Sequence, residues 1–511
     1  MTDFTLTLPS EIIFDAFLYL DYPGLMSVKL TCKRFYDIIK ARALWMHFVR
    51  LLEENHGYSL PEEESVYTVD ALEQWVMRRL RVLDIWSRSS SPRCKVHACF
   101  ERSSIQDAAP VTDDSKTTYS LLPGGRWLLS ISDASGPGVF LYDLEATGSA
   151  NGNALVVIDA KSWSDGIVNQ GTISPNDTGF SRQRQYKFWI DYSKTQMTFL
   201  VAVMSFDSQR TVGVCGIVET RLSGYGSDAS FNIRPRANFQ FEVGNRQFDS
   251  ALMTFNNRYL VVAGVDRMGL DHVPITVVDY SASVHRQGSP VIVNPEAFML
   301  DSSIDRDLEF IHGNTFALFR KTAIHLFEVV SPNDPERPPI VEELHSIPLG
   351  NEEDPNAGYE WSPLRRFPGA SNISMRSLNA EFSILTISDT KSKPSSSPLT
   401  GRAEYDQLLH QEDRWALPTS FLFQGISWSV TWLGSPTGTV LELLEHQKGG
   451  DSAENKNRRR TVSLPEDLKA KFKGDKPQNA ILGFDEETGR LVVGLQEKKE
   501  KNVRLMAIDI V

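Results

Sequence analysis

The stretch Leu8-Pro9-Ser10-Glu11-Ile12-Ile13 opens the part of the chain whose structure the sequence indicates most clearly. Proline fits the first turn of a helix, where no amide donor is needed, and serine caps free amides there. Apolar residues from Ile12 to Leu20 then recur at helical spacing. We therefore predict a short helix that starts at this hexapeptide.

A second helical start follows directly. Asp21 can cap a helix, and Pro23 fits its first turn. Leu25 and Val28 mark an apolar face beyond it, and we expect the helical segment to end near Trp45. Such a small unit cannot bury all its apolar surface alone, so part of that surface must contact a partner within the chain or outside it.

Residues 51–92 are predicted to link this helical unit to the rest of the chain. We expect a loop at 51–60 and a helix entry at 60–64, where three glutamates favour the positive end of a helix dipole. A longer helix is predicted from Asp70 to Ile85. One stripe of that helix carries Leu72, Trp75, Val76, Leu80 and Leu83, whereas Glu73, Arg78, Arg79 and Arg81 lie largely off it.

From about residue 95 the hydrophobic period changes from helical to β. The recurring unit is a turn, a short run of β-branched or aromatic residues, a connection, and a second such run that ends in an acidic residue. Its clearest copies pair 127–130 with 139–143, 259–262 with 275–279, 316–319 with 324–328, and 491–494 with 503–509. With weaker runs included, the spacing is roughly 45 to 70 residues over about seven copies, which is typical of β-propellers.

Lys95 to Phe100 reads as an extra strand before the first copy. In a closed ring this strand can complete the last sheet and remove its exposed edge. The predicted fold class is therefore α+β multidomain, with an α-helical unit at residues 6–50 and a helical linker at 51–92. An all-β domain of about seven propeller blades is expected at 93–511.

The bulk composition argues against several classes of protein. The chain has 511 residues, of which 41% are hydrophobic, so it can fill more than one core. Its net charge of −12 argues against nucleic-acid or membrane-surface binding by the whole protein. It has no stretch apolar enough to span a bilayer and no secretory signal pattern. Because its four cysteines fit a reducing compartment, we expect a cytoplasmic or nuclear location, or both.

The N-terminal residues from Leu8 to Trp45 resemble an F-box in unbroken order. No single pair of residues is specific to that family, but the ordered set is. The resemblance implies a Skp-family adaptor as partner and, through it, a cullin–RING ubiquitin ligase. The matching elements are Leu8-Pro9-Ser10-Glu11-Ile12-Ile13, Leu18-Tyr19-Leu20-Asp21, Leu25 to Thr31, Cys32-Lys33-Arg34-Phe35 and Leu44-Trp45.

The same resemblance implies which residues bind the adaptor. Leu8, Pro9, Ile12 and Ile13 would insert into the adaptor's groove. The other predicted residues would pack around these four or hold the helices together. The alternative is that these side chains dock the helices onto the chain's own body. The predicted residues are Leu8, Pro9, Ile12, Ile13, Leu20, Leu25, Val28, Leu30, Cys32, Lys33, Phe35 and Trp45.

The β body resembles WD-repeat propeller receptors only in layout, similar to fungal-type F-box proteins with degenerate propellers. The Gly-His and Trp-Asp signatures are absent, and only an acid at the strand end is kept, as at Asp143, Asp279 and Asp509. No substrate-binding residue can therefore be carried over, and the expected protein substrate stays unidentified.

No catalytic motif accompanies these features. Cys94, His97 and Cys99 offer three potential metal ligands, but structural zinc usually takes four, and their alternation fits an ordinary strand. We expect the acidic runs at 352–354 and 486–487 to lie in solvated turns. No metal, cofactor or catalytic residue is predicted.

Two polar segments, Lys391 to Gly401 and Gln447 to Arg460, are expected to be surface loops. The second ends in three arginines, which could serve nuclear import or contact an acidic partner, although a solvated loop is the preferred interpretation.

The sequence thus favours a substrate-receptor subunit of a Skp–cullin–F-box ubiquitin ligase, acting by holding a target close to the charged conjugating enzyme. Two alternatives stay open. One is an F-box scaffold that works outside a ligase. The other is a propeller enzyme with an accessory helical domain and two carboxylates that converge across a pocket.

Overall fold

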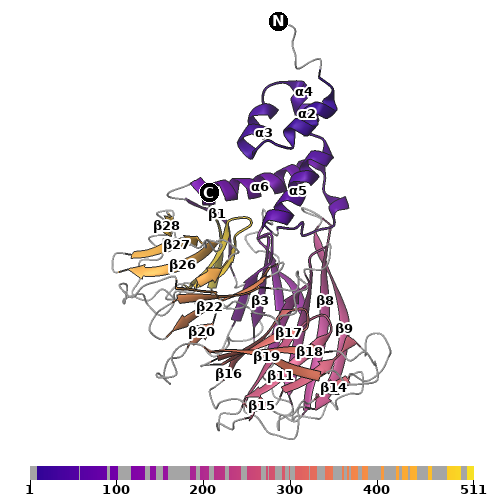
Figure 1. The fold of residues 1–511 in the computed structure, drawn as a ribbon, viewed down its shortest axis with the longest axis vertical. Helices are drawn as coiled ribbons and strands as arrows, with labels where there is room; N and C mark the ends of the chain where they lie inside the picture. The colour runs from indigo at the N-terminus through magenta and orange to yellow at the C-terminus, as the bar shows by residue number, and fades with distance from the viewer. Residues whose placement is uncertain are drawn as a thin grey trace.

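The chain folds into a small helical part that lies on one end of a large β part, as the computed structural model in Figure 1 shows. The structure describes residues 8–56, 58–88 and 93–101 and, between residues 117 and 510, the strands given below with several of the turns that join them. Its helices are α2 (Ser10–Phe17), α3 (Tyr22–Lys29), α4 (Lys33–Ile39), α5 (Arg42–His56), the 3₁₀ turn η1 (Glu64–Val66) and α6 (Val69–Arg88).

The first helices start where the sequence indicates. Helix α2 begins directly after Pro9, and the carboxylate of Asp21 caps α3 by accepting a hydrogen bond from the Gly24 amide at 2.9 Å. The predicted end near Trp45 is wrong, because α5 continues to His56. Its apolar stripe extends through Phe48 and Leu52, both buried, so the helix keeps a packing surface over its whole length.

The predicted linker differs from the structure in two further ways. The expected loop at 51–60 is helical as far as His56, and the expected helix entry at 60–64 leads only to η1. Glu62 is buried there and accepts a hydrogen bond from the hydroxyl of Tyr67, so the segment is held by side-chain contacts. The division at residues 50, 51, 92 and 93 stays a prediction, although α5 runs through the first boundary.

The predicted helix from Asp70 to Ile85 is confirmed as α6. Its stripe also behaves as predicted, since Leu72, Trp75 and Val76 are buried. The polar side of the prediction is partly wrong: Arg79 is 3% exposed and Glu73 is 9% exposed. Both residues bind side chains from elsewhere in the chain, and helical periodicity alone does not predict such contacts.

The β part contains seven sheets of four or five strands among the described residues. The first sheet contains β2 (Thr117–Leu121), β3 (Trp127–Ser132), β4 (Val139–Asp143) and β5 (Ala154–Ile158), and the second contains β6 (Gln185–Ile190), β7 (Thr198–Phe206), β8 (Val212–Ser223) and β9 (Ser230–Glu242). The third contains β10 (Ser250–Phe255), β11 (Tyr259–Val265), β13 (Ile275–Asp279) and β14 (Val291–Val293), and the fourth contains β16 (Asp305–His312), β17 (Thr315–Arg320), β18 (Ala323–Val330) and β19 (Ile340–Pro348). The fifth sheet contains β20 (Tyr359–Trp361), β21 (Arg365–Phe367), β22 (Ala370–Ser377), β23 (Phe382–Ser388) and β24 (Glu404–Gln407), and the sixth contains β25 (Leu422–Gln424), β26 (Trp428–Ser435), β27 (Gly438–Glu445) and β28 (Arg459–Val462). The seventh contains β29 (Ala480–Asp485), β30 (Arg490–Gln496), β31 (Val503–Ile510) and β1 (Cys94–Glu101). A separate pair joins β12 (His272–Val273) to β15 (Phe298–Met299).

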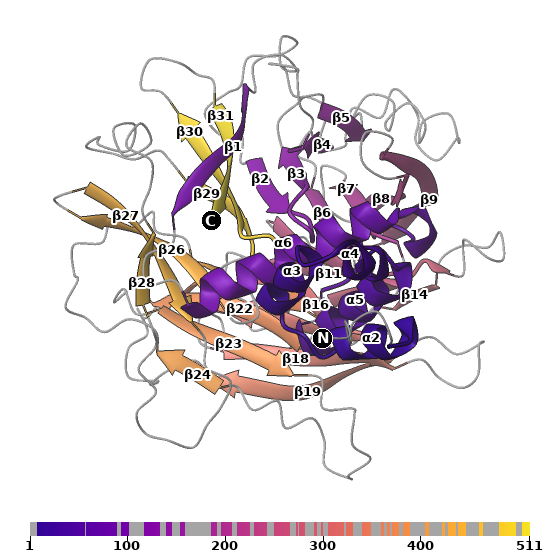
Figure 2. The same cartoon turned by 90° about the horizontal axis from the view of Figure 1, so that it is seen from above.

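Successive sheets contact each other through their first strands, through β22 in the fifth sheet, or through apolar side chains between sheets, and β2 of the first sheet contacts β29 of the last. Figure 2 shows the sheets arranged around a common centre, as in a propeller. The four predicted pairs of runs are the second and third strands of their sheets, paired antiparallel. The predicted α+β fold with a propeller-like β domain is therefore confirmed.

The predicted closing strand is also confirmed. β1 pairs antiparallel with β31, so residues from both ends of the β part lie in the seventh sheet. Cys94 lies opposite Ile510, and both are buried, whereas Lys95 is exposed. This alternation matches the ordinary two-faced strand that the sequence favoured over a metal site.

Three sheets repeat an arginine–aspartate pair at the same place. The arginine begins or directly precedes the second strand, and the aspartate lies at or next to the end of the third. The acids were recognised in the sequence as strand ends, whereas the arginines were not. The pairs are Arg126 with Asp143 at 2.6 Å, Arg258 with Asp279 at 2.9 Å and Arg490 with Asp509 at 2.7 Å.

Several other predictions fall on residues that the structure does not describe. The predicted loop at 391–401 and the acidic run at 352–354 lie outside the described residues, as does most of 447–460. The last two residues of that second segment, Arg459 and Arg460, belong to strand β28, so the predicted loop ends earlier than expected.

Two glycines at equivalent turns between first and second strands have different surroundings. Gly125 and Gly313 both adopt positive φ angles, of 67° and 53°. A Cβ atom on Gly125 would lie 2.2 Å from Oγ1 of Thr488, because the turn of the first sheet packs on the turn of the last. A Cβ atom on Gly313 would meet nothing within 4 Å.

We expect Gly125→Ala to destabilise the protein by about 3 kcal/mol and Gly313→Ala by about 1 kcal/mol. Both substitutions place a side chain in the left-handed region, but only the first also drives a methyl group into the last sheet. Urea unfolding of the two variants measures the difference. Equal losses would show that the contact between the first and last turns contributes nothing to stability.

Candidate partner-binding surface and its joint with the propeller

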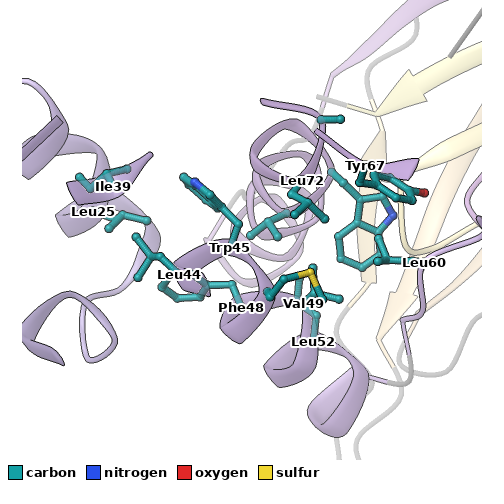
Figure 3. Close-up of a cluster of buried hydrophobic side chains, with 14 of the residues drawn as sticks. Leu25, Ile39, Leu44, Trp45, Phe48, Val49, Leu52, Leu60, Tyr67 and Leu72 are labelled. Atoms are coloured by element: carbon teal, nitrogen blue, oxygen red, sulfur yellow. The ribbon is translucent and has the colours of Figure 1, made fainter. Parts of the chain in front are cut away.

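The N-terminal helices have a core of their own, shown in Figure 3. Leu25, Ile39, Leu44 and Trp45 are fully buried in it, and Leu72 of α6 belongs to the same cluster. Burial of each large apolar side chain stabilises the folded state by about 1.5–3 kcal/mol. The helices from α2 to α6 therefore form one packed unit, here called the helical unit.

The helical unit also exposes large apolar side chains. Ile12, Tyr19, Leu30 and Tyr36 are 53%, 90%, 83% and 42% exposed, and they are here called the exposed apolar set. Within the part of the chain that the structure describes, two further large apolar side chains, Val66 and Ile340, are comparably exposed. The exposed apolar set thus lies between residues 12 and 36, within the helices that the sequence predicts to bind a partner.

The structure separates the predicted adaptor-binding residues into three groups, and their role in binding stays a prediction. The buried ones can act only by holding the helices together, whereas the exposed ones are free to contact a partner. Ile13, Leu25 and Trp45 are buried; Leu8, Leu20, Val28 and Phe35 are partly buried; and Pro9, Ile12, Leu30, Cys32 and Lys33 are exposed.

Two members of the exposed apolar set are absent from the sequence prediction. Tyr19 lies in the turn after α2, and its place in the matched element Leu18-Tyr19-Leu20-Asp21 is the signal that could have found it. The ring of Tyr36 lies between two lysines, with Nζ of Lys29 at 5.7 Å and Nζ of Lys40 at 5.5 Å from its centroid. Both lysines also bind carboxylates of α6, Lys29 that of Glu73 and Lys40 that of Asp70, so the ring of Tyr36 borders an ion-pair group.

The helical unit is attached to the propeller mainly through α6 and the seventh sheet, a contact here called the joint. Val82 and Trp86 of α6 share a buried cluster with apolar residues of β29, β30 and β31. The indole ring of Trp86 meets the ring of Phe484 edge-on at 6.2 Å, and its Nε1 donates to the carbonyl of Glu486 at 3.3 Å. A helix packed in this way cannot rotate without opening the sheet's core.

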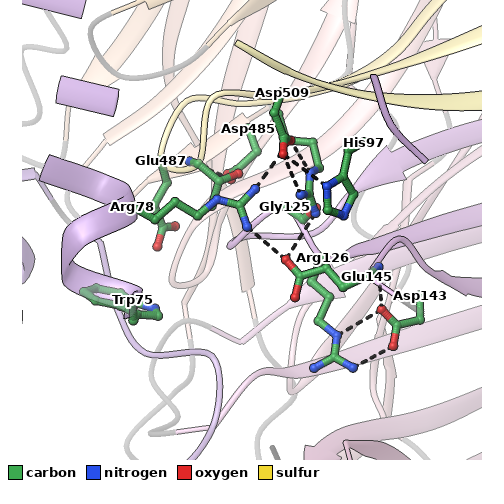
Figure 4. Close-up of polar contacts among 12 residues, drawn as sticks. Trp75, Arg78, His97, Gly125, Arg126, Asp143, Glu145, Asp485, Glu487 and Asp509 are labelled. Carbon is green, nitrogen blue, oxygen red and sulfur yellow. Dashed lines mark hydrogen bonds and ion pairs between the residues drawn. The ribbon is translucent and has the colours of Figure 1, made fainter. Parts of the chain in front are cut away.

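A buried ion pair lies in the same joint, next to the polar contacts of Arg78, Glu145 and Asp509 that Figure 4 shows. The guanidinium of Arg79 stacks 3.5 Å from the ring centroid of Trp75 and binds the carboxylate of Glu487. The predicted solvated turn at 486–487 is therefore wrong: both glutamates are 7% exposed, because α6 covers their turn. Burial raises the pKa of the Glu487 carboxyl to about 7, while the charge of Arg79 opposes that rise.

A second polar group borders the joint, where Arg78 of α6 donates to Glu145 at 2.9 Å and to Asp509 at 3.5 Å. The fully buried Arg490 also binds Asp509 and donates to the carbonyl of Gly125 at 3.0 Å. Although burial raises the pKa of the Asp509 carboxyl, these arginines outweigh it and hold that pKa below its usual value.

The segment before α6 adds a contact with the second sheet. The carbonyl of Pro61 accepts a hydrogen bond from the amide of Met197, and Gln196 donates to Glu63 at 3.2 Å. The helical unit therefore contacts turns of the first, second and seventh sheets. They lie between a first and a second strand or, at Glu145, just after a third strand, and in an antiparallel sheet both places are at the same end.

Two absences concern the described residues alone. No group of three or more His, Cys, Asp or Glu side chains there could hold a metal ion. None of the described helices is long and apolar enough to cross a membrane.

Residues 5–51 match the protein-family model described as F-box-like, which confirms the resemblance found in the sequence. No curated protein matches the chain. The sequence-based interpretation of a degenerate propeller behind an F-box agrees with the sheet topology described above.

Several solved structures have a similar fold. The Nup170 N-terminal domain from the Chaetomium thermophilum Nup170–Nup53 complex has a TM-score of 0.44 at 10% identity, covering 83% of this chain. This chain spans only 62% of the length of that one. The Cps50 (Swd1) β-propeller domain of Myceliophteria thermophila has a TM-score of 0.37 at 12% identity, covering 78% of this chain and 98% of its own. Oligopeptidase B from Leishmania major has a TM-score of 0.35 at 10% identity, with coverages of 83% and 50%.

The raised pKa of Glu487 makes the free energy of unfolding depend on pH in a direction that can be worked out. A carboxyl whose pKa is higher in the folded state than in the unfolded state contributes most stability at low pH, and that contribution is lost as pH rises towards the folded pKa. We therefore expect wild type to lose about 2–3 kcal/mol more than Glu487→Gln between pH 5 and pH 8. Urea unfolding at both pH values tests this, and parallel pH profiles for the two proteins would contradict it.

Proposed function

We propose that this protein is the substrate-receptor subunit of a Skp–cullin–F-box ubiquitin ligase. The observation that carries the proposal is the F-box-like match at residues 5–51, whose helices expose an apolar set and are packed onto a propeller. An amphipathic helical surface laid into an apolar groove is a common recognition mode. In this proposal the exposed set contacts a Skp-family adaptor, and a cullin joins through that adaptor.

The propeller is proposed to bind the protein substrate. The helical unit covers turns between first and second strands, at one end of the sheets. The second strands end, and the third strands begin, at the opposite end of the sheets, which the described helices leave uncovered. Loops at such an end suit substrate recognition, because they vary without disturbing the sheets. Holding substrate and conjugating enzyme together then lowers the barrier to transfer without a catalytic group in the receptor.

The described chemistry supports a non-catalytic role. Burial raises the pKa of the Cys94 thiol to about 12 and that of the Cys215 thiol well above its ordinary value, so neither is a reactive thiolate. Asp307 and Glu309 are neighbouring carboxylates on β16, but both bind the ammonium of Lys187. They therefore lack the two distinct environments that an acid–base pair for glycoside cleavage needs.

A second candidate function is a scaffold that uses the adaptor outside a ligase. The contacts described above suit both functions, because both need the exposed apolar set and a binding propeller. Purification of the adaptor complex from cells separates them, since a cullin accompanies the complex only if the protein works in a ligase. We place either activity in the cytosol, the nucleus or both.

A pull-down with matched variants tests adaptor binding. Pro9, Ile12 and Leu30 are exposed, so replacing all three by alanine leaves the core of the helical unit intact. We expect adaptor binding to weaken at least about 100-fold, since each buried aliphatic side chain contributes about 1.5–3 kcal/mol.

Ile340→Ala is the control, because Ile340 is 55% exposed and Ile12 is 53% exposed, but Ile340 lies on the propeller strand β19. It should bind the adaptor like wild type. Unchanged binding by the triple variant, with its unfolding midpoint preserved, would overturn the proposed function.

A further inference from the structure

The seventh sheet differs from the others in where its strands come from. β1 ends at Glu101 and β29 begins at Ala480, so the sheet joins distant parts of the chain. Helix α6 ends at Arg88, only a few residues before β1 begins at Cys94. The position of β1 beside β31 therefore limits where the end of α6 can lie.

The apolar side of the joint uses residues from both ends of the chain. Its buried cluster contains Trp86 of α6, Cys94 of β1, Leu491 of β30 and Ile508 of β31. Gly489, in the turn before β30, has a φ of 65°, and a Cβ atom there would lie 3.3 Å from a methyl carbon of Val82. Removing either α6 or β1 would thus expose the same set of side chains to water.

The polar side of the joint converges on one carboxylate. Asp509 of β31 accepts from Arg490 at 2.7 and 3.1 Å, from Arg78 of α6 at 3.5 Å, and has Nδ1 of His97 of β1 at 3.4 Å. Arg490 in turn lies 3.3 Å from Glu145, just after the third strand of the first sheet. Asp509, on the strand that β1 pairs with, therefore contacts the helix α6, the closing strand β1 and the strand β30.

The equivalent pair in the third sheet provides a comparison within the same molecule. Asp279 binds Arg258 at 2.9 Å and also accepts from the amide and hydroxyl of the neighbouring Ser281. Neither of these two partners belongs to the helical unit. The arginine–aspartate pair of the seventh sheet thus has the same contact as the pair of the third sheet, and in addition one contact each from α6 and β1.

We propose that docking of α6 and completion of the seventh sheet by β1 are one cooperative event. The helical unit then takes a fixed orientation only on a propeller whose last sheet is complete, and opening that sheet releases the helix. The coupling is reciprocal, because contacts that stabilise one element through a shared group stabilise the other equally. This device is independent of the proposed function, since it holds whatever partner the helical unit binds.

Hydrogen exchange on the full-length chain without any adaptor tests the proposal. The variants Arg78→Ala and Arg79→Leu change only α6, and neither residue lies in β1 or β31. We expect each to speed amide exchange at least tenfold in residues 94–101 and 503–510, as well as in α6, because local opening of coupled elements becomes more frequent together. Exchange in the fourth sheet, β16–β19, should stay unchanged, which also shows that the variants fold.

Two controls complete the design. Arg81→Ala changes an exposed arginine on the same helix and should leave exchange in β1 and β31 at the wild-type rate. Asp509→Asn should speed exchange in α6, whereas Asp279→Asn should act within the third sheet alone. Faster exchange in α6 with unchanged exchange in β1 and β31 in both α6 variants would overturn the proposal. Because no adaptor is present, that result would leave the pull-down outcome unaffected.

Discussion

The ion pair between Arg79 and Glu487 fixes how the two parts of this protein fit together. Both side chains are buried, and a charge removed from water is tolerated only when its counter-charge lies beside it. Sliding α6 by one turn along the sheet would leave both charges unpaired in an apolar contact. Packing of Val82 and Trp86 supplies the attraction between helix and sheet, and the ion pair selects one position for it.

Much of the fold follows from local pattern. Helical spacing identified α2, α3 and α6, and turns followed by β-branched runs identified hairpins whose strands are close in sequence. The loop expected at 51–60 is wrong as far as His56, because Phe48 and Leu52 of α5 pack in the same buried cluster as α6. Tertiary packing of an apolar face often extends a helix beyond what its own residues favour.

The candidate site was less predictable than the fold. Ile12 and Ile13 are identical and adjacent, yet the first is 53% exposed and the second 5% exposed. A similar contrast separates Arg79 from Arg81 on α6: Arg81 is exposed, whereas Arg79 is buried against Glu487, which is 408 positions away in the chain. Burial of a charged residue depends on such distant partners, and no local pattern contains them.

The composition of the seventh sheet also sets an order of events during synthesis. The ribosome completes α6 and β1 long before residues 480–510, which supply most of the surface that α6 packs on. At about 5–20 residues per second, the roughly 400 intervening residues take about 20–80 seconds to translate. Throughout that interval Val82 and Trp86 have no docking surface, so the nascent chain presents an apolar helix face on which chaperones can act.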